Sequence, residues 1–486
     1  MADEERRAFL RIFSVLWAIG ALFHLGKWSL WADTPANLAL AVAATFVILR
    51  PGEMLSWGGL FAAQVWALAL DMPRTSNHLL LSGLVGLLGF LAVAMRLVRR
   101  ESLDPGAVYR DFAPPARVIL LLVFLLAAFH KLNADWFDVE VSCGGQLWAT
   151  IAERVPGAPD ATWARWAAIG GGIAIEVTAP ILLLTRRLRL VGLGMAWWFL
   201  YLVGIAGFFN FAAVTGALLF LFAPSNLDAL MPAARRRWPA LERFAAAARS
   251  EVVRRGLRLA PPIVAGTAIL VALSRPWAGW TPEPILLREI ASGARPTISY
   301  AFDVAWAFLG LAAAGALALA VRAGRAEWPT ARQLLAHPAP ALGVAPLLVL
   351  LFGIAPYLGL RSEVAFGMFS NVRTEAGSNH LLVRRPLDLL GMQTDLVRIE
   401  SSSDPELRQV ASRGYLLPWL EFQEYVRARA RATGPDFSVT YVRERARREV
   451  ERAGLDPELM RPAPFLIREL VVFRPVWTGE RNPCRH

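Results

Sequence analysis

The sequence predicts an all-α polytopic transmembrane helix bundle followed by a small extracytoplasmic α+β domain. Three observations indicate this fold class. Hydrophobic residues make up 56% of the 486 residues and the mean hydropathy is +0.42, as is typical of a membrane protein with several spans. Apolar segments recur along most of the chain, and arginines gather in the short loops between them.

The expected spans follow from these apolar segments. They lie at residues 12–26, 36–49, 54–70, 77–95, 117–130, 163–184, 188–206, 208–223, 261–274, 300–321 and 339–358. Several are shorter than the ~20 residues that a straight span needs, so we expect 36–49 and 54–70 to be a tilted or re-entrant pair. Glycines inside the spans are explained by close helix packing.

The distribution of arginine predicts the topology. A net charge of +12 would suggest a nucleic-acid partner in a soluble protein, but here positive-inside orientation explains it, and we expect no nucleic acid. The expected cytoplasmic loops hold Arg50, Arg96, Arg99, Arg100, Arg110, Arg117, Arg186, Arg187, Arg189, Arg235 to Arg237, Arg243, Arg249, Arg254, Arg255, Arg258, Arg322, Arg325 and Arg332. The outer loops hold fewer cations: Lys27, Arg74, Lys131, Arg154, Arg165, Arg275, Arg288 and Arg295. The N-terminus is therefore expected in the cytoplasm, and we expect no cleavable signal peptide.

The C-terminal residues 386–486 contain no apolar run long enough to span a membrane and are expected outside as an α+β domain. Residues 397–399 and 437–442 alternate like half-buried strands, and 465–476 is a third strand candidate. Residues 417–432 and 443–453 have the pattern of arginine-rich amphipathic helices. Cys143 and Cys484 then share the oxidising side, where they form either a disulfide or two separate thiols. Neither cysteine lies in a metal-binding spacing, so no metal site is expected.

Polar residues gather at the expected outer ends of the spans, where they are costly and usually mark a site. They are His24, Lys27, Ser76, Asn77, His78, His130, Lys131, Asp135 and Trp136. The sequence Ser-Asn-His-Leu-Leu at 76–80 occurs again at 378–382, where it cannot start a span, and the repeat is also explained by chance.

Lys131 is one of only two lysines among 51 basic residues. An amine can lose its proton when desolvated, whereas a guanidinium in practice cannot, so Lys131 is either a base or a lysine that snorkels to the headgroups. Trp136 is either an aromatic wall for a ligand ring or an interfacial belt residue. Glu176, inside the sixth span, is expected to be either paired or protonated, with a structural or a functional role.

Three motifs resemble a known family. Phe129-His130-Lys131-Leu132-Asn133-Ala134-Asp135-Trp136 resembles the catalytic-lysine segment of vitamin K-dependent γ-glutamyl carboxylase, with His130 in place of its first lysine and Asn133 in place of its aspartate. Ser76-Asn77-His78-Leu79-Leu80 resembles that family's histidine segment, and residues 366–375 look like its bacterial relatives, the horizontally transferred transmembrane (HTTM) domain proteins. The resemblance covers residues 8–385, an HTTM-like transmembrane domain, in scattered motifs.

The resemblance implies a quinol-dependent lyase of a bacterial inner or plasma membrane. Lys131, assisted by His78, would deprotonate a reduced quinone such as vitamin K hydroquinone or a menaquinol. Oxygenation to an epoxide would drive carboxylation of a glutamate with CO2 in an extracytoplasmic peptide. We expect Asn77, His130, Asp135 and Trp136 to contact the quinol, and membrane lipid to be a partner. The alternatives are another quinol- or lipid-modifying enzyme, and a non-enzymatic lipid- or quinone-binding protein in which Lys131 and His78 form a structural network.

Overall fold

The computed structural model describes residues 3–28, 35–227, 297–324, 326–336 and 339–484, together with Leu230, Pro232 and Arg236. The expected span at 261–274 lies outside the described residues, as do Arg275, Arg288, Arg295, Arg325 and all but Arg236 of the arginines expected between 235 and 258. The side chain of Lys27 also lies outside the described part of the chain.

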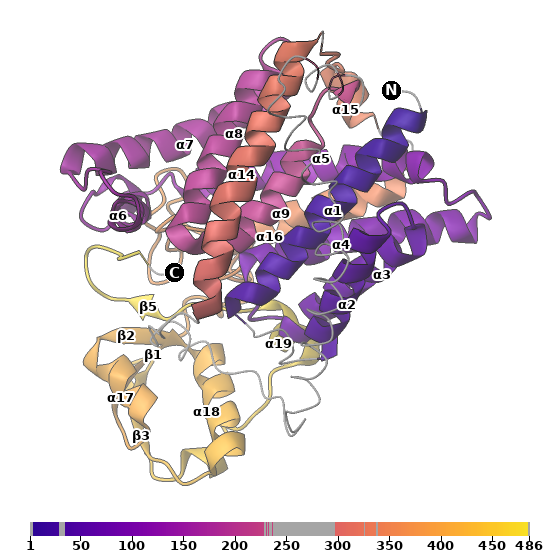
Figure 1. Ribbon diagram of the computed structural model, residues 1–486. Helices are drawn as coiled ribbons and strands as arrows, with labels where there is room; N and C mark the ends of the chain where they lie inside the picture. Colours follow the sequence, from indigo (N-terminus) through magenta and orange to yellow (C-terminus); the bar gives the residue numbers. More distant parts are fainter. Residues whose placement is uncertain are drawn as a thin grey trace.

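A bundle of helices forms the larger part of the molecule (Figure 1). Its helices are α1 (Asp3–Trp28), α2 (Pro35–Leu49), α3 (Met54–Asp71), α4 (Asn77–Val98), α5 (Pro105–His130), α6 (Cys143–Arg154), α7 (Thr162–Leu184), α8 (Arg189–Val203), α9 (Phe209–Phe220), α14 (Thr297–Ala323), α15 (Ala331–Leu335) and α16 (Val344–Ile354). Single turns of 3-10 helix occur at η1 (Asp135–Phe137), η3 (Pro340–Gly343) and η4 (Ala355–Leu358).

Six helical segments of the described chain are long and apolar enough to cross a membrane. They are Asp3–Leu25, Asn77–Val98, Pro105–His130, Thr162–Leu184, Arg189–Phe220 and Pro340–Leu358. The structure therefore supports a helical membrane protein. The expected short pair forms α2 and α3, and at 15 residues α2 is shorter than a straight span. The tilt of this pair in a bilayer stays a prediction.

The segment Arg189–Phe220 is two helices rather than one long span, as the sequence predicts. They join through a π-helical turn, η2 (Gly204–Phe208), in which Gly207 has a φ of +98° that only glycine adopts easily. The start of α8 and the end of α9 lie near the same loop, residues 329–334. At the start of α8, Arg189 donates to Pro329 O (2.6 Å). Just after α9, Leu221 O accepts from Arg117, which also donates to Leu334 O (2.9 Å each). The chain therefore folds back at Gly207, and η2 lies at the opposite end of the bundle from this loop.

An aromatic cluster fills the centre of the bundle between α1, α3 and α5. Trp57 contacts Phe61 edge-on at 4.3 Å between ring centroids and Phe112 at 5.2 Å, while Phe13 stacks on Trp17 at 5.6 Å. The Trp17 indole donates to Gln64 Oε1 (2.9 Å), so its buried N–H has a partner.

The C-terminal residues form an antiparallel sheet with its own hydrophobic core. The strand order is β4-β3-β1-β2-β5, with β1 (Leu396–Ser402), β2 (Tyr415–Pro418), β3 (Val439–Arg443), β4 (Ala446–Val450) and β5 (Val476–Trp477). The remaining elements are α17 (Pro405–Ser412), α18 (Trp419–Thr433), the turn η5 (Ala453–Leu455) and α19 (Phe465–Leu470). The expected strands at 397–399 and 437–442 and the expected helix at 417–432 are thus present as β1, β3 and α18.

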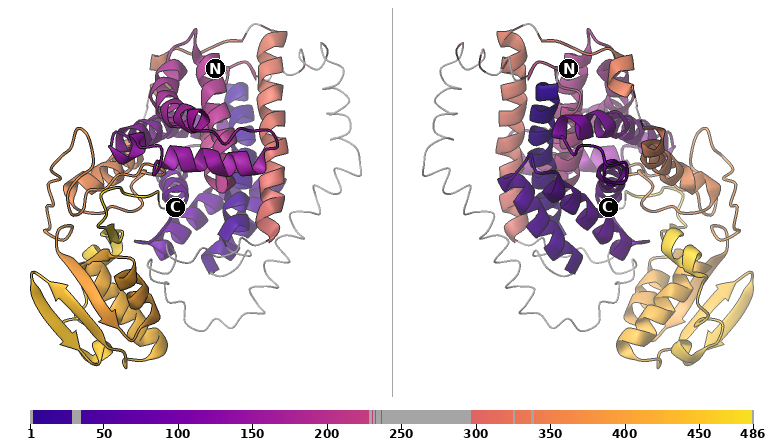
Figure 2. Two further views of the ribbon diagram at one scale, coloured as in Figure 1. Left: turned by 90° about the vertical axis from the view of Figure 1, so that its left-hand side faces the viewer. Right: turned by 90° about the vertical axis from the view of Figure 1, so that its right-hand side faces the viewer.

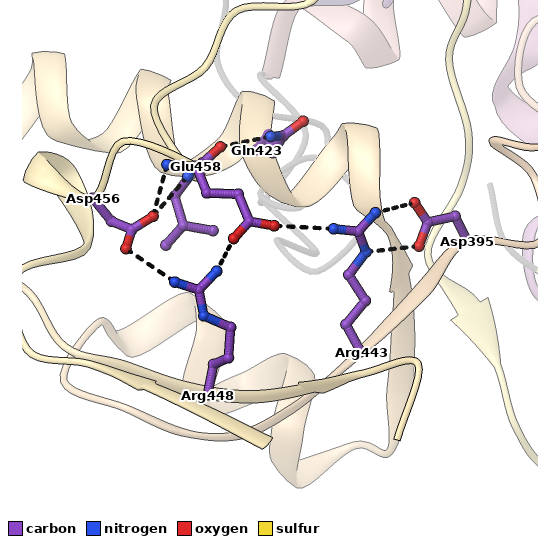
Figure 3. Close-up of polar contacts among 7 residues, drawn as sticks. Asp395, Gln423, Arg443, Arg448, Asp456 and Glu458 are labelled. Carbon is purple, nitrogen blue, oxygen red and sulfur yellow. Dashed lines mark hydrogen bonds and ion pairs between the residues drawn. The ribbon is translucent and has the colours of Figure 1, made fainter. Parts of the chain in front are cut away.

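Two of the sequence-based elements in this domain are wrong. Residues 443–453 form no helix, because Glu444 and Arg445 turn the chain with positive φ (+49° and +70°) into β4, which pairs with β3. Figure 3 shows what the arginines do instead: Arg443 donates to Asp395 (2.9 and 2.8 Å), and Arg448 pairs with Glu458 beside it. The strand expected at 465–476 is instead a short helix over its first half, α19, and only its last residue, Val476, joins the sheet together with Trp477.

The N-terminus and the sheet domain lie at opposite ends of the bundle in all three views (Figures 1 and 2). Arg7 of α1 pairs at 2.7 Å with Asp104, which lies in the same loop as Arg99 and Arg100. This arginine-rich loop is therefore at the N-terminal end of the bundle. Near the other end, Arg74 after α3 pairs with Glu421 of α18 at 3.2 Å.

Candidate functional site

Lys131, which ends α5, lies in a buried ion pair with Glu176 of α7. Its Nζ is 2.9 Å from Glu176 Oε1, and both side chains are 4% exposed. Nζ also donates to Ala127 O and Met368 O, each at 3.4 Å. Glu176 is therefore paired rather than isolated. A snorkelling lysine would carry its ammonium to water, and this one does not.

Trp136 packs against the pair. It lies in the turn η1, is 2% exposed, and its ring centroid is 5.2 Å from Lys131 Nζ, within cation–π range. Gly144 of α6 makes room for the indole, because a Cβ there would come within 2.9 Å of the ring. Trp136 is thus an inner wall of the site rather than an interfacial belt residue.

Two buried polar atoms beside the pair lack hydrogen-bond partners within the described residues: Trp136 Nε1 and Glu176 Oε2. One is a donor and the other an acceptor, and a buried polar atom is costly to leave unsatisfied. A ligand hydroxyl fits this arrangement, because it can donate to a carboxylate oxygen while it accepts from an indole N–H. The residues present therefore suit a phenol-like group such as one end of a quinol.

His78, in the first turn of α4, lies in a second polar cluster. Its Nε2 is 2.7 Å from His24 Nδ1, 2.9 Å from Asn210 Nδ2 and 3.1 Å from Ser76 Oγ. Ser76 also caps α4 by accepting from Leu79 N (3.4 Å), which explains the first Ser-Asn-His copy structurally. Asn210, in the largely apolar helix α9, is not among the residues expected at the site from the sequence.

The segment 364–371 connects the two clusters. Asn77 Oδ1 accepts from Phe366 N (2.8 Å) next to His78, while Met368 O accepts from Lys131. Val364, Phe366, Phe369 and Asn371 all have φ between +52° and +57°. Left-handed φ is rare for non-glycine residues, and such strain gathers at functional sites. His78 and Lys131 are thus linked through one strained loop.

His130 and Asp135, which are expected to contact a quinol, both bond to other residues of the protein. His130 is fully buried, with Nδ1 2.8 Å from Tyr357 Oη and Nε2 3.0 Å from Ala365 O. Asp135 accepts from Asn379 Nδ2 at 2.5 Å. Among the four expected binding residues, Trp136 has its ring beside Lys131 Nζ, while Asn77, His130 and Asp135 bond to the loops around the pair.

The second Ser-Asn-His copy packs onto the end of α5. His380 Nε2 donates to Phe129 O (2.9 Å), and its Nδ1 accepts from Leu382 N (3.1 Å) and Val383 N (3.0 Å). Burial lowers the pKa of His380, and this bonding pattern requires the neutral ring. The copy has a structural role.

Two asparagines that are not among the expected site residues hold the loop 364–371 in place. Asn133 accepts from Trp136 N (2.8 Å) and donates to His130 O (2.8 Å) and to Ser370 O. Asn371 accepts from Cys143 N (2.7 Å) and donates to Asn482 O (3.1 Å). Both asparagines lie inside the motifs that resemble the carboxylase family, and this position was the one sequence feature that pointed to them.

A disulfide joins Cys143 to Cys484, with 4.8 Å between the Cα atoms. The sequence left open a disulfide or two separate thiols, and the structure has the disulfide. Cys143 and Cys484 pack with Trp136 and Phe369 in one small apolar cluster, so the C-terminal tail is tied directly over the site.

The fold and the site together define a polytopic helical membrane protein with a buried lysine–glutamate pair at one end of the bundle. Comparison with family models, with curated proteins and with solved structures finds no match. The likeness to γ-glutamyl carboxylase and to HTTM proteins therefore rests on the three motifs alone.

Proposed function

We propose that the protein is an integral membrane enzyme that takes a proton from a quinol and passes the quinol to oxygen, as the resemblance implies. The observation that carries the proposal is the buried Lys131–Glu176 pair, in which Glu176 Oε2, like the nearby indole N–H of Trp136, has no hydrogen-bond partner among the described residues. A quinol would arrive from the lipid, and burial would keep water from the reacting anion.

The contacts favour Glu176 Oε2 as the atom that receives the proton. Each of the three donors of the Lys131 ammonium has an acceptor, namely Glu176 Oε1, Ala127 O and Met368 O. The quinol O–H bond would break, the proton would go to Oε2, and the remaining ammonium charge would stabilise the anion. This differs from the sequence-based expectation that Lys131, assisted by His78, is the base. Bound reduced quinone supplies the electrons for oxygen.

His78 is part of the proposal as a positioning residue. It lies with His24 on the far side of the loop that carries Met368 O, so a change at His78 would reach Lys131 through residues 366–368. Its replacement should therefore weaken quinol turnover less than replacement of Glu176.

Coupled carboxylation of a peptide glutamate with CO2, the carbon–carbon lyase reaction, is the finer part of the proposal. The motifs support it, together with the disulfide that holds the C-terminal tail next to Trp136. The alternative is a non-enzymatic quinone- or lipid-binding protein. The satisfied hydrogen bonds of Lys131 favour that alternative, since they also suit a structural network.

We further propose a bacterial inner or plasma membrane with the N-terminus in the cytoplasm and the sheet domain, residues 386–486, outside. Arginine-rich loops lie at the N-terminal end, and the disulfide, which needs an oxidising compartment, lies near the other. Arg452→Cys, on an exposed side chain of the sheet domain, would give a labelling site. Reaction with an impermeant thiol reagent in intact cells would support this orientation, and reaction only after lysis would contradict it.

The function is tested by oxygen-dependent epoxide formation from menaquinol or vitamin K hydroquinone by the full chain in nanodiscs, followed by mass spectrometry. Glu176→Gln should abolish turnover because it removes the carboxylate that takes the proton. Lys131→Arg should also abolish it, because the arginine fork would bind both carboxylate oxygens of Glu176. Trp136→Phe should raise KM, because it removes only the indole N–H.

The matched control is Trp198→Phe, since Trp198 is 55% exposed on α8 and its ring stacks on Tyr201. It should retain wild-type activity. If the wild type binds quinol without turning it over, and Glu176→Gln binds it equally well, the quinone-binding proposal would replace the enzymatic one. Supplying labelled CO2 and a glutamate peptide in the same assay tests the carboxylation step.

A further inference from the structure

Exposed apolar side chains are concentrated in two segments that follow the last candidate span. After Leu351, every exposed large hydrophobic side chain of the described chain except Leu455 belongs to the loop 381–390 or to α19. They are Leu381, Leu382, Leu387, Leu389, Leu390, Phe465, Leu466 and Leu470, with exposures from 41% to 68%. We call these eight side chains the apolar collar. Such a patch is unusual on a surface that faces water.

Hydrogen bonds place the first segment at the ends of two spans. Leu381 N donates to Leu132 O, directly after α5, at 2.8 Å. Leu387 N donates to Tyr357 O (2.8 Å) and Leu389 N to Leu358 O (3.0 Å), at the end of the last span. The loop therefore lies at the depth where the spans leave the hydrocarbon.

The second segment, α19, lies on the same side of the bundle. Val472, just after it, forms a parallel bridge with Arg361, which follows the last span. Ile467 of α19 packs in one cluster with Met392, which follows the loop of the first segment, so the two segments meet. No residue of α19 itself is buried, and Figure 1 draws it between the sheet domain and the lower ends of the bundle helices.

The charges in these segments suit a headgroup layer. The exposed Arg384 and Arg385 lie between the leucine pairs, and Arg468 lies over the Phe465 ring at 5.7 Å in α19. Leucine and phenylalanine flanked by arginine is the composition of interfacial anchors, whose apolar side enters the acyl boundary while the guanidinium heads remain among the headgroups.

We infer that the apolar collar is inserted into the lipid headgroup layer of the membrane that the bundle spans, and that it seats the sheet domain on that surface. The last span, to whose end the loop bonds, also has exposed leucines at Leu347, Leu350 and Leu351. This inference does not depend on quinol chemistry.

Spin labels on single introduced cysteines test the insertion, since both native cysteines are in the disulfide. Leu382→Cys and Leu466→Cys report on the two segments in full-length protein in nanodiscs. The matched control is Arg447→Cys on β4, whose side chain is 60% exposed and carries no part of the collar. Collisions with oxygen, which concentrates in lipid, are compared with collisions with a water-soluble nickel chelate.

The labels at 382 and 466 should lie ~5–10 Å into the headgroup and acyl boundary, with an oxygen-to-nickel accessibility ratio several-fold above that at 447. A ratio at either position equal to that at 447 would overturn the inference. Shielding from both reagents would also overturn it, because it would show that protein rather than lipid covers the surface. Because the replaced side chains are exposed, labelling should leave the thermal unfolding temperature unchanged, which verifies the fold.

Discussion

The buried pair makes a specific prediction about stability, which a double-mutant cycle can measure. Lys131→Met and Glu176→Met each replace a charged side chain by an unbranched apolar one of similar length. Each single change leaves the other charge buried in a site that is 4% exposed. The double change removes both charges and keeps most of the volume.

The expected magnitudes follow from these contacts. Loss of one partner of a buried ion pair costs ~3–5 kcal/mol in the free energy of unfolding, because the remaining charge is uncompensated. In the Glu176 variant the ammonium keeps only two carbonyl acceptors, both at 3.4 Å. In the Lys131 variant, Glu176 Oε1 loses the ammonium donor that lies 2.9 Å away. The double variant should lie within ~1 kcal/mol of wild type or above it.

The assay is reversible unfolding of the full chain in mixed micelles with a denaturing detergent. The matched control is the ion pair between Arg165 of α7 and Asp160, at 2.8 Å against 2.9 Å for the buried pair, whose side chains are 36% and 46% exposed. Its coupling should be far smaller, because water screens it. Equal coupling in the two cycles would refute the reasoning that Lys131 and Glu176 form a desolvated pair.

Three further predictions use the same unfolding measurement. A Cβ on Gly204 would overlap the Trp306 indole, so Gly204→Ala should cost ~1–3 kcal/mol, whereas Gly194→Ala, with nothing within 4 Å, should be close to neutral. Cys484→Ser opens a bridge between residues 341 apart in sequence and should cost ~2–5 kcal/mol, and an equal effect of reductant on wild type would verify its cause. Burial lowers the pKa of His380 in the folded state, so its contribution to stability is present above the unfolded value of about 6.5 and is lost as the pH falls below it. His380→Gln should remove this part of the pH dependence, and an unchanged slope would contradict the assignment.

The helical part of the fold could be predicted well because its signal is local. Apolar runs are visible in the sequence itself, and they separate α8 from α9 correctly. Gly207, expected as a packing glycine, instead makes the turn between them with its positive φ. The sheet domain was harder. Arginines at 443–452 have a helical spacing, but the left-handed turn at Glu444 and Arg445 and pairing with β3 override that preference.

The site was predictable only where a costly residue type revealed it. Lys131, His78 and Glu176 were identified because charged or titratable groups are rare in spans. Their partners were not, since the Lys131–Glu176 pair joins residues 45 apart and Asn371 bonds Cys143 across 228. An uncharged asparagine does not stand out in the sequence as a charged residue in a span does. The partners of Asn133 and Asn371 are visible only in the folded structure.

The central claim, that the Lys131–Glu176 pair receives the quinol proton, is tested most directly by infrared difference spectroscopy. Quinol is added without oxygen to the full chain in nanodiscs, and the carboxyl C=O stretch is followed. We predict a new band from a protonated carboxylic acid, absent in Glu176→Gln and retained in Trp198→Phe. Quinol binding to the wild type with no such band would contradict the claim.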